Sequence, residues 1–574
     1  MVAARPAGLR LRSFGLFVVS LIPAMILSPW IVHTWVNVPY HDDWGTPGHQ
    51  LVLLCQGKLT LAALFAQHNE SRPFFARLIF IPLAMAGGWD VRRVICATFL
   101  LVCGASFLLH CLVRRLPAIT QPGVLTLSLI VNLILFWPNS EIWTYSNNFM
   151  LVFPPVALLC ALLVNLSSIS LRDKILLNGL LATVSTYWWA NGMMLWLLGV
   201  PLSRDGKSAK WYLVYITAAV INISFYFHGY HRPQDSPPFS WHPAELSGYF
   251  FTWLGAFFGD EQKALGLGVG GLVLLLVSAN GSLLRAFDRR DFTACYPWLV
   301  LGLYAIASGV LAAIGRSGLG ISQAMSPRYT AVSGYLYIAA AGLGYLNWQT
   351  LREKLPPNKL RFPRFAVLIA AVLCIPLAIQ SYARGLGVLT TIGEHRKALL
   401  VAWQWSKAIP QSPELELLLP NVGMLQQFGG VLEEHNVLRI PRMDPQIMAH
   451  WSYSDKAADA ANGVLNSCEV TSDGWLSVSG WSRLPDHTGS ADCVLLTVSG
   501  PGSPARPLAM LPTDLPSPDI AAALNDNQLS QSAFNMALPM DGLPKGRLTV
   551  AAWAVDLKQS MIRPLAHTFI AEER

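Results

Sequence analysis

Charged side chains are scarce in this chain. Asp, Glu, Lys and Arg make up 13% of its 574 residues, whereas a soluble domain carries about 25%. The nine cysteines contain no CxxC or CxxCH pattern, which argues against cysteine zinc sites and haem attachment. The sequence also lacks an internal repeat and a low-complexity tract. Hydrophobic residues, in contrast, reach 53%, so the composition predicts a polytopic membrane protein with a polar part attached.

A membrane-spanning helix needs about 20 apolar residues, and about eleven runs qualify as α-helical spans. They are residues 14–32, 91–113, 122–138, 149–167, 175–189, 190–202, 211–228, 263–279, 294–314, 329–347 and 365–380. The runs 175–189 and 190–202 are short and can form one broken pair around "YWWANG". The first run follows several arginines, as in a signal peptide, but no clear A-x-A cleavage site is present, so we expect an uncleaved span.

Segment 73–89, "PFFARLIFIPLAMAGGW", decides the orientation of everything after it. It is apolar enough to cross, but it carries Arg77 near its start and Pro82 at its centre. If it lies along the outer surface, the inside loops hold about twice as many Lys and Arg as the outside loops, as the positive-inside rule requires. We therefore predict an inner or plasma membrane protein with a cytoplasmic N-terminus and an extracytoplasmic, or periplasmic, C-terminal part.

The net charge of +8 is explained by the Lys and Arg residues of the short loops, which set the topology. No nucleic-acid partner is expected.

The composition divides the chain into three regions. Residues 1–380 form the transmembrane domain with a large first outer loop, 33–90; residues 381–463 form a mixed helical connection; and residues 464–574 form a mainly-β sandwich. The predicted strands are "GWLSVSGWS", "CVLLTVSG", "RPLAML", "AFNMALP" and "RLTVAAWAVD". Trp475 and Trp481 share one face of their strand and are expected in its core. Cys468 and Cys493 can form a disulfide only if this tail is extracytoplasmic.

Four polar segments are predicted to open on the outer side of the membrane. They are residues 33–72, 137–148, 229–262 and 315–329. Ionisable residues at the edges of spans are costly, and they are usually paired or functional. The ionisable site candidates in these segments are Asp42, Asp43, His68, Glu70, Arg72, Glu141, Arg316 and Arg328. Carboxylates and arginines gathered on one side suit a substrate that carries hydroxyls and a phosphate.

Three motifs in two of these segments resemble the GT-C superfamily of polytopic glycosyltransferases. The resemblance lies in "HDDW" (41–44), "HNESR" (68–72) and "GR…G…A…SPRY" (315–329), and in architecture it covers about residues 14–380. The superfamily includes protein O-mannosyltransferases, aminoarabinose transferases and arabinosyltransferases, and some members carry an extracytoplasmic β-sandwich. The resemblance implies a polyprenyl-phosphate-sugar donor, an envelope glycan, lipid or protein acceptor, an extracytoplasmic site and inversion at the anomeric carbon. The chain departs from some relatives at Ser71, where they have a second histidine.

The residue roles follow from this chemistry. Sugar transfer needs a base for the acceptor hydroxyl and cations for the leaving phosphate. The resemblance implies that the base is Asp42 or Asp43, with the first acid of the pair favoured. The expected donor-phosphate ligands are Arg316, Arg328 and Arg72, with Tyr329 flanking the phosphate. The expected sugar, acceptor or metal-supporting residues are His68, Glu70, Glu141 and Trp44, the last by stacking on a sugar ring. A divalent cation is left open, because some members of the superfamily use one and others do not.

Other functions remain open from the sequence. A transporter or flippase for a lipid-linked sugar is one, although such proteins often show repeated halves and midplane sites. An oligosaccharide polymerase or ligase is another, and a non-catalytic scaffold that presents the β-domain is a third. The residues themselves also have ordinary explanations. An Asp pair can cap a helix, arginines can anchor at the lipid headgroups, and the loose cluster of His228, His231 and His242 is expected to be structural.

Overall fold

The computed structural model describes residues 7–201, 209–233, 241–286, 292–354, 356, 361–453, 460, 463–484, 489–500, 503–540 and 546–572. The chain divides into two compact units. The helical unit comprises Met1–Thr34, Leu59–Leu83 and Arg93–Thr390. The C-terminal unit comprises Trp35–Lys58, Ala84–Arg92 and Thr391–Arg574. Parts of the predicted first outer loop therefore belong to each unit.

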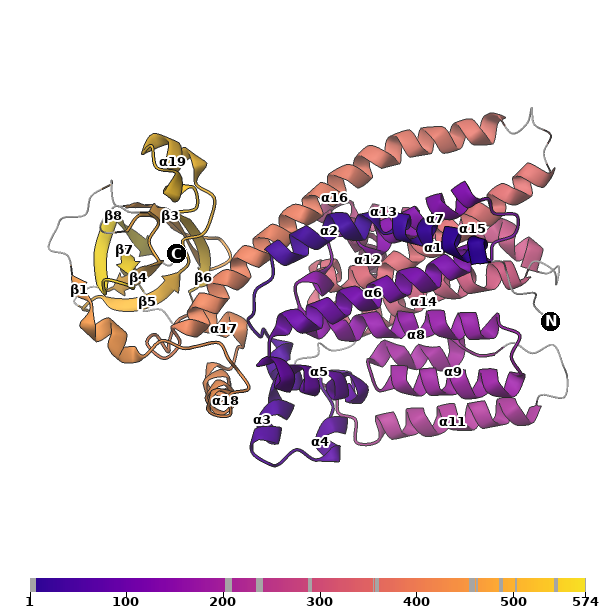
Figure 1. Ribbon diagram of the computed structural model, residues 1–574, viewed down its shortest axis with the longest axis horizontal. Helices are drawn as coiled ribbons and strands as arrows, with labels where there is room; N and C mark the ends of the chain where they lie inside the picture. The colour runs from indigo at the N-terminus through magenta and orange to yellow at the C-terminus, as the bar shows by residue number, and fades with distance from the viewer. Residues whose placement is uncertain are drawn as a thin grey trace. The chain divides into compact units, whose positions relative to one another are not determined.

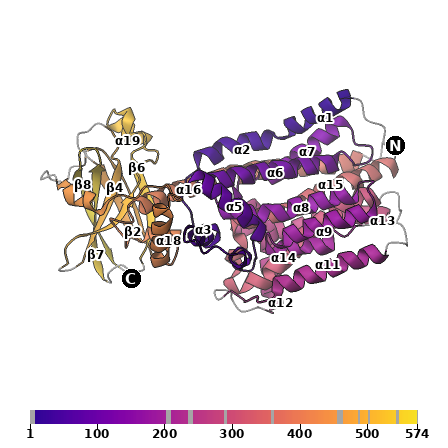
Figure 2. The same ribbon diagram turned by 60° about the horizontal axis from the view of Figure 1, so that its bottom comes forward.

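The helical unit is a bundle in which the long helices run side by side (Figures 1 and 2). Its helices are α1 (Ala7–Ser20), α2 (Ile22–His33), α4 (Leu61–Phe65), α5 (Phe74–Gly87), α6 (Val91–Val113), α7 (Gln121–Leu135), α8 (Phe149–Asn165), α9 (Leu171–Thr186), α10 (Leu195–Leu198), α11 (Ala209–Phe227), α12 (Pro243–Gly255), α13 (Glu261–Ala286), α14 (Phe292–Arg316), α15 (Thr330–Lys354) and the first part of α16 (Arg361–Gln404). Large apolar side chains are exposed along α11 and α13, among them Leu213, Ile221 and Val277. An apolar surface of this extent suits lipid contact.

Four helical segments are long and apolar enough to cross a membrane within the described part of the chain. They are Val91–Val113, Ser146–Asn165, Glu261–Asn280 and Phe292–Leu319. The pair α1 and α2, bent by 46°, makes a fifth candidate if it is one span. Every predicted run except 190–202 falls on a helix. By their length and composition, however, only the four or five helices named above qualify as spans, so eleven spans are not confirmed. Helix α5 has only 14 residues, and at about 1.5 Å per residue it is shorter than the hydrocarbon core.

The run 190–202 is the exception, and its last residue lies outside the described residues. The chain breaks at "YWWANG": α9 ends at Thr186, and a 3₁₀ turn (Ala190–Met194) and α10 follow. The turn is tight because the chain folds back onto α9, where a side chain at Gly192 would come within 1.8 Å of the Ser185 carbonyl oxygen. The predicted span at 190–202 was therefore wrong as a continuous helix, whereas the predicted break is present.

The long polar segment 229–262 also contains a helix that the sequence did not indicate. Helix α12 packs directly on α13, and glycines make this close approach possible. A Cβ at Gly255 would lie 1.8 Å from the Ala264 carbonyl oxygen, and one at Gly268 would lie 1.8 Å from the Phe251 carbonyl oxygen. Small residues at such contacts are typical of helix packing within membranes.

The C-terminal unit combines short helices with a β-domain. Its helices are α3 (His49–Cys55), the last part of α16, α17 (Glu414–Leu418) and α18 (Val422–Glu434), followed in the β-domain by α19 (Pro518–Ala523). The aromatic residues Trp44, Trp89 and Trp403 pack together in this unit, with ring centroids 5.0 and 5.4 Å from Trp44. Segments from residues 35–58, 84–92 and 391–440 therefore share one core.

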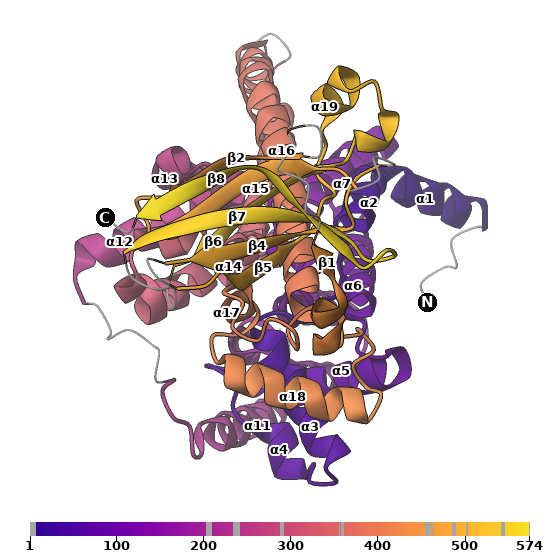
Figure 3. The same cartoon turned by 90° about the vertical axis from the view of Figure 1, so that its left-hand side faces the viewer.

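The β-domain is a single curved sheet of eight strands (Figure 3). The strands are β1 (Ser452–Tyr453), β2 (Gly463–Val470), β3 (Trp475–Ser482), β4 (Cys493–Ser499), β5 (Arg506–Leu511), β6 (Ala533–Pro539), β7 (Arg547–Asp556) and β8 (Met561–Glu572). Seven of them follow the order β5-β4-β7-β8-β2-β3-β6, and β1 pairs with β8. All five predicted strand segments are strands, while β1, β2 and β8 were not predicted.

This sheet is barrel-like rather than clearly a sandwich. A bridge between Leu515 and Ala533 joins the segment after β5 to the start of β6, so the two ends of the sheet approach each other. Inward residues of β2 to β8 share one core cluster, because alternating side chains of a closed sheet point to its centre. Trp481 is buried, and Trp475 is half-buried. Cys468 and Cys493 are free, buried thiols in different core clusters, so no disulfide joins them.

Candidate functional site at the polar end of the helical bundle

The predicted polar segments of the helical unit meet at one end of the bundle (Figure 1). We call this the polar end, formed by residues 66–72, 137–148, 228–233, 256–260 and 316–329. Residues 327–329 pack against both 141–143 and 256–258, and hydrogen bonds and an ion pair join the other segments. Gln67 bonds both the carbonyl oxygen and the N–H of His231. Asn139 donates to the Ala256 carbonyl oxygen at 3.4 Å, and Glu70 pairs with Arg316. The structure thus brings together segments that are far apart in the sequence.

The "HNESR" segment forms a tight turn. His68 and Ser71 exchange two backbone hydrogen bonds of 2.8 and 2.9 Å, and Asn69 adopts the left-handed conformation that this turn requires. The Ser71 hydroxyl is buried and accepts a hydrogen bond from the Ala190 N–H at 3.1 Å. The turn is therefore anchored against the "YWWANG" break, and it holds Glu70 at a defined place.

Arg72 is a tether between segments. Its Nε donates to the Tyr226 carbonyl oxygen at 2.7 Å, and its two terminal nitrogens donate to the carbonyl oxygens of His228, at 2.8 Å, and Phe65, at 3.3 Å. Two of these carbonyls lie at the C-terminal end of α11, where orphan carbonyls and the helix dipole favour a cation. Arg72 faces backbone oxygens here, so its predicted place among the phosphate ligands has no support from its contacts.

Glu70 and Arg316 form an ion pair across 246 residues of sequence. The Arg316 terminal nitrogen lies 2.6 Å from the Glu70 carboxylate, and both side chains are about one-third exposed, at 31% and 35%. Arg316 is the last residue of α14. The Tyr226 hydroxyl also donates to the Glu70 backbone carbonyl at 2.6 Å. The carboxylate thus orients a guanidinium that remains accessible from solvent.

A second polar group surrounds Tyr249 on α12. Its hydroxyl donates to the Gln323 side-chain oxygen, and Gln323 donates to the Tyr329 hydroxyl at 3.0 Å. Burial raises the pKa of Tyr249, and the positive charges of Arg316 and Arg328 oppose that effect. The Arg328 guanidinium lies 5.9 Å from the centre of the Tyr329 ring. Both arginines of segment 316–329 therefore act on one phenol.

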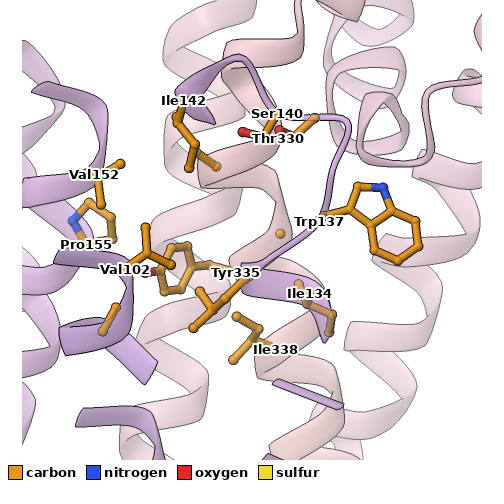
Figure 4. A pocket seen from close by; sticks show the side chains of 14 residues that line it. Val102, Ile134, Trp137, Ser140, Ile142, Val152, Pro155, Thr330, Tyr335 and Ile338 are labelled. Atoms are coloured by element: carbon orange, nitrogen blue, oxygen red, sulfur yellow. The ribbon is translucent and has the colours of Figure 1, made fainter. Parts of the chain in front are cut away.

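Glu141 lies at the start of a 3₁₀ turn (Glu141–Trp143) that packs near a second 3₁₀ turn (Pro327–Tyr329). It is half-buried, and its carboxylate accepts a hydrogen bond from Asn148 at 3.2 Å. Beneath these turns is a small apolar crevice with a cavity volume of about 20 Å³. Figure 4 shows Val102, Ile134, Tyr335 and Ile338 around the crevice, with Ser140 and Thr330 at the end nearest the turns.

The acidic pair belongs to the C-terminal unit. Asp43 is 2% exposed, and its carboxylate accepts a hydrogen bond from the Tyr40 N–H at 3.0 Å, which closes a turn. Asp42 is half-exposed. Trp44 is fully buried between Trp89 and Trp403. The predicted stacking of Trp44 on a sugar ring was wrong, because no face of its ring is exposed.

Metal ligation has no support from the described residues. Among them, the structure gathers no group of three or more His, Cys, Asp or Glu side chains that could hold a metal ion. His228 and His231 take part through backbone atoms, as acceptors from Arg72 and Gln67. Their predicted structural role therefore agrees with the contacts that they make.

Sequence reasoning passed over Tyr249, Gln323, Gln67 and Tyr226. All are uncharged, and a search for paired charges does not find them. Tyr249 and Gln323 do lie in two of the polar segments, and that position is the signal that could have found them. No protein-family model matches this chain, and neither a curated protein nor a solved structure does.

Proposed function

We propose that this protein is a membrane glycosyltransferase similar to the GT-C superfamily. It moves a sugar from a polyprenyl-phosphate donor to a hydroxyl of an envelope glycan, lipid or protein, at the extracytoplasmic face of an inner or plasma membrane. The observation that carries the proposal is the accessible Arg316, which pairs with Glu70 at the polar end, with Arg328 beside Tyr329 in the same segment.

Two arginines are well suited to hold a lipid-linked phosphate. A guanidinium binds phosphate oxygens through paired N–H groups and keeps its charge at any physiological pH. Glu70 contacts one terminal nitrogen of Arg316, so other N–H groups of the same guanidinium can serve the phosphate. Arg328 is half-buried beside Tyr329, which supports the predicted role of this tyrosine as a neighbour of the phosphate.

A lipid-linked donor, rather than a free nucleotide sugar, is proposed because the resemblance implies one and because the apolar side chains exposed along α11 and α13 suit lipid contact. The small apolar crevice between α6, α7, α8 and α15 has room for about one water molecule and is too small for a prenyl unit. In the same proposal, α7, α9, α11, α15, the first part of α16 and the broken stretch that contains α10 also cross the membrane. With the five candidate spans, the bent pair α1 and α2 counted as one, these six make eleven crossings.

The reaction requires a base as well as phosphate ligands. Asp42 takes the proton of the acceptor hydroxyl, the acceptor oxygen bonds to the anomeric carbon, and the bond from that carbon to the phosphate oxygen breaks. Polyprenyl phosphate leaves with the electron pair and is held by Arg316 and Arg328. Asp42 is favoured over Asp43 because Asp43 is buried and bonded to the Tyr40 N–H.

The test is transfer of radiolabelled sugar from a panel of polyprenyl-phosphate-sugars by the purified full-length protein, with and without a chelator. We expect Asp42→Asn to lower kcat by about a thousandfold or more, as removal of a general base does. Arg316→Gln should raise the KM for the donor. The matched control is Arg92→Gln, which removes an exposed ion pair with Asp90 (2.7 Å) and should leave transfer unchanged.

Other outcomes would redirect the proposal. Full turnover by Asp42→Asn together with loss in Asp43→Asn would reassign the base. Bound donor lipid without transfer by the wild-type protein, for every sugar tried, would favour a transporter or flippase. Loss of transfer on chelation would show that a divalent cation takes part.

A further inference from the structure

Several contacts within the C-terminal unit hold the "YHDDWG" segment. The His41 N–H donates to the Leu418 carbonyl oxygen at 2.7 Å, at the end of α17. The Trp44 indole N–H donates to the Pro39 carbonyl oxygen at 3.1 Å. The ring of Trp44 packs on Trp403 of α16. Residues about 360 to 380 positions later in the chain thus hold both sides of the acidic pair.

Arg396 makes a further contact with this segment. Its guanidinium carbon lies 3.4 Å from the centre of the Tyr40 ring, which is cation–π distance. Arg396 is only 7% exposed, so water screens this attraction weakly. Tyr40 in turn donates its N–H to the Asp43 carboxylate, and the Asp43 N–H donates to the Tyr40 carbonyl oxygen at 3.0 Å. Arg396 is therefore linked to the turn through Tyr40.

The turn itself has little room to move. His41 has a positive φ of 45°, a conformation that costs energy for a residue with a side chain and that persists only where its surroundings impose it. A side chain at Gly48 would meet the Trp89 ring at 2.9 Å and the Asp43 carbonyl oxygen at 3.0 Å. With Asp43 and Trp44 buried, Asp42 is the acid that this rigid turn presents to solvent.

We propose that Arg396 is a positioning residue for Asp42, and that helix α16 orders the acidic turn through it. The inference rests on the proposed function for its kinetic consequence. The structural part of the inference is that Arg396 orders the turn Tyr40–Trp44, and it can be tested without measuring sugar transfer.

The experiment compares Arg396→Met and Arg396→Lys in the purified full-length protein with Arg384→Met. Arg384 is an exposed arginine earlier on the same helix, and it pairs with Asp260. The first readout is hydrogen exchange of peptides that cover residues 38–46. We expect faster exchange there in Arg396→Met, partial protection in Arg396→Lys, and wild-type exchange in Arg384→Met. Exchange in strands β2 to β8 should stay unchanged, which separates loss of the turn from global unfolding.

The second readout is sugar transfer. Arg396→Met should lower kcat by about tenfold or more, while the KM for the donor stays within about twofold, because the donor-phosphate arginines lie in the helical unit. Combined with Asp42→Asn, the same substitution should add no further loss, since both act through one carboxylate. Arg396→Lys should recover part of the rate.

Unchanged exchange at residues 38–46 in Arg396→Met would overturn the inference, and so would additive losses in the double variant. If the wild-type protein transfers no sugar, the proposed function fails, and the exchange result alone decides whether Arg396 orders the acidic turn. If Arg396→Met does not fold, Arg396→Lys provides the same comparison.

Discussion

At the scale of single residues, three arginines of this chain differ by what surrounds them. Arg72 donates to backbone carbonyls, Arg316 pairs with a carboxylate at a solvent-exposed place, and Arg396 stacks on an aromatic ring in a buried place. In our proposal, the contacts of Arg72 stabilise the fold, those of Arg316 leave N–H groups for a ligand, and those of Arg396 align a neighbouring turn. Residue type alone does not distinguish these roles.

From the contacts of Arg72, we expect its substitution to lower the stability of the protein without weakening donor binding. Arg72→Gln removes charge-assisted hydrogen bonds to two carbonyls at the end of α11, and we expect a loss of about 2 kcal/mol in the free energy of unfolding. The KM for the donor should not change. Arg92→Gln, which breaks an exposed pair with Asp90, is the control and should change stability by less than about 1 kcal/mol. If Arg72→Gln instead raised the KM for the donor and left stability unchanged, Arg72 would be a phosphate ligand, as the sequence predicted.

Glu414 predicts a pH dependence in the C-terminal unit. It is fully buried, with a hydrogen bond from the Ser412 hydroxyl, and burial raises the pKa of its carboxyl from 4.5 to about 7. Because the folded state binds the proton more tightly than the unfolded state, this group favours folding below pH 4.5. That contribution is lost as the pH rises through about 7.

Glu414→Gln should therefore stabilise the protein at pH 8, by up to about 3 kcal/mol, and change little at pH 4.5. The measurement is the difference in unfolding free energy between variant and wild type across that range. A difference that does not vary with pH would show that Glu414 keeps an ordinary pKa in the folded state.

At the scale of elements, close helix packing depends on which glycines face a neighbour. Gly268 and Gly270 lie on the same helix, α13, and have the same intrinsic helix propensity. A Cβ at Gly268 would lie 1.8 Å from the Phe251 carbonyl oxygen, whereas a Cβ at Gly270 meets nothing within 4 Å. The contact of α12 with α13 positions Tyr249, and through it Gln323 and Tyr329.

Gly268→Ala should consequently destabilise the protein by about 2 kcal/mol or more, since backbone atoms must move apart. Gly270→Ala should be neutral or slightly stabilising, because alanine is the better helix former. Thermal unfolding of the two purified variants in one detergent gives the comparison. Equal effects would mean that α12 does not pack on α13 through this glycine.

At the scale of the whole molecule, the fold collects polar segments at one end of an apolar bundle. The basic loops predicted the side of the membrane on which that end lies, and the orientation is testable without the enzyme assay. A phosphatase that is active only outside the cytoplasm, fused after residue 118, should be inactive, and the same reporter fused after residue 574 should be active. The reverse pattern would place the polar end in the cytoplasm, where the proposed donor site could not face the extracytoplasmic surface.

Local patterns were enough for much of the secondary structure. Apolar runs predicted helices such as Val91–Val113, because a helix satisfies its own backbone hydrogen bonds wherever it is buried. Alternating residues predicted strands such as Trp475–Ser482, because side chains alternate across a sheet. The four polar segments, with His68, Glu70 and Arg316 in them, were also visible as departures from an apolar background.

Contacts between distant segments decided the rest. The sequence could not show that Glu70 meets Arg316, that Arg72 meets carbonyls of α11, or that Trp44 is enclosed by Trp89 and Trp403, because each depends on packing across many tens of residues or more. The same holds for the closure of the sheet into a barrel-like form and for the grouping of the acidic pair with residues 391–440. Hydropathy and periodicity act along one segment, whereas a site is made where several segments pack together.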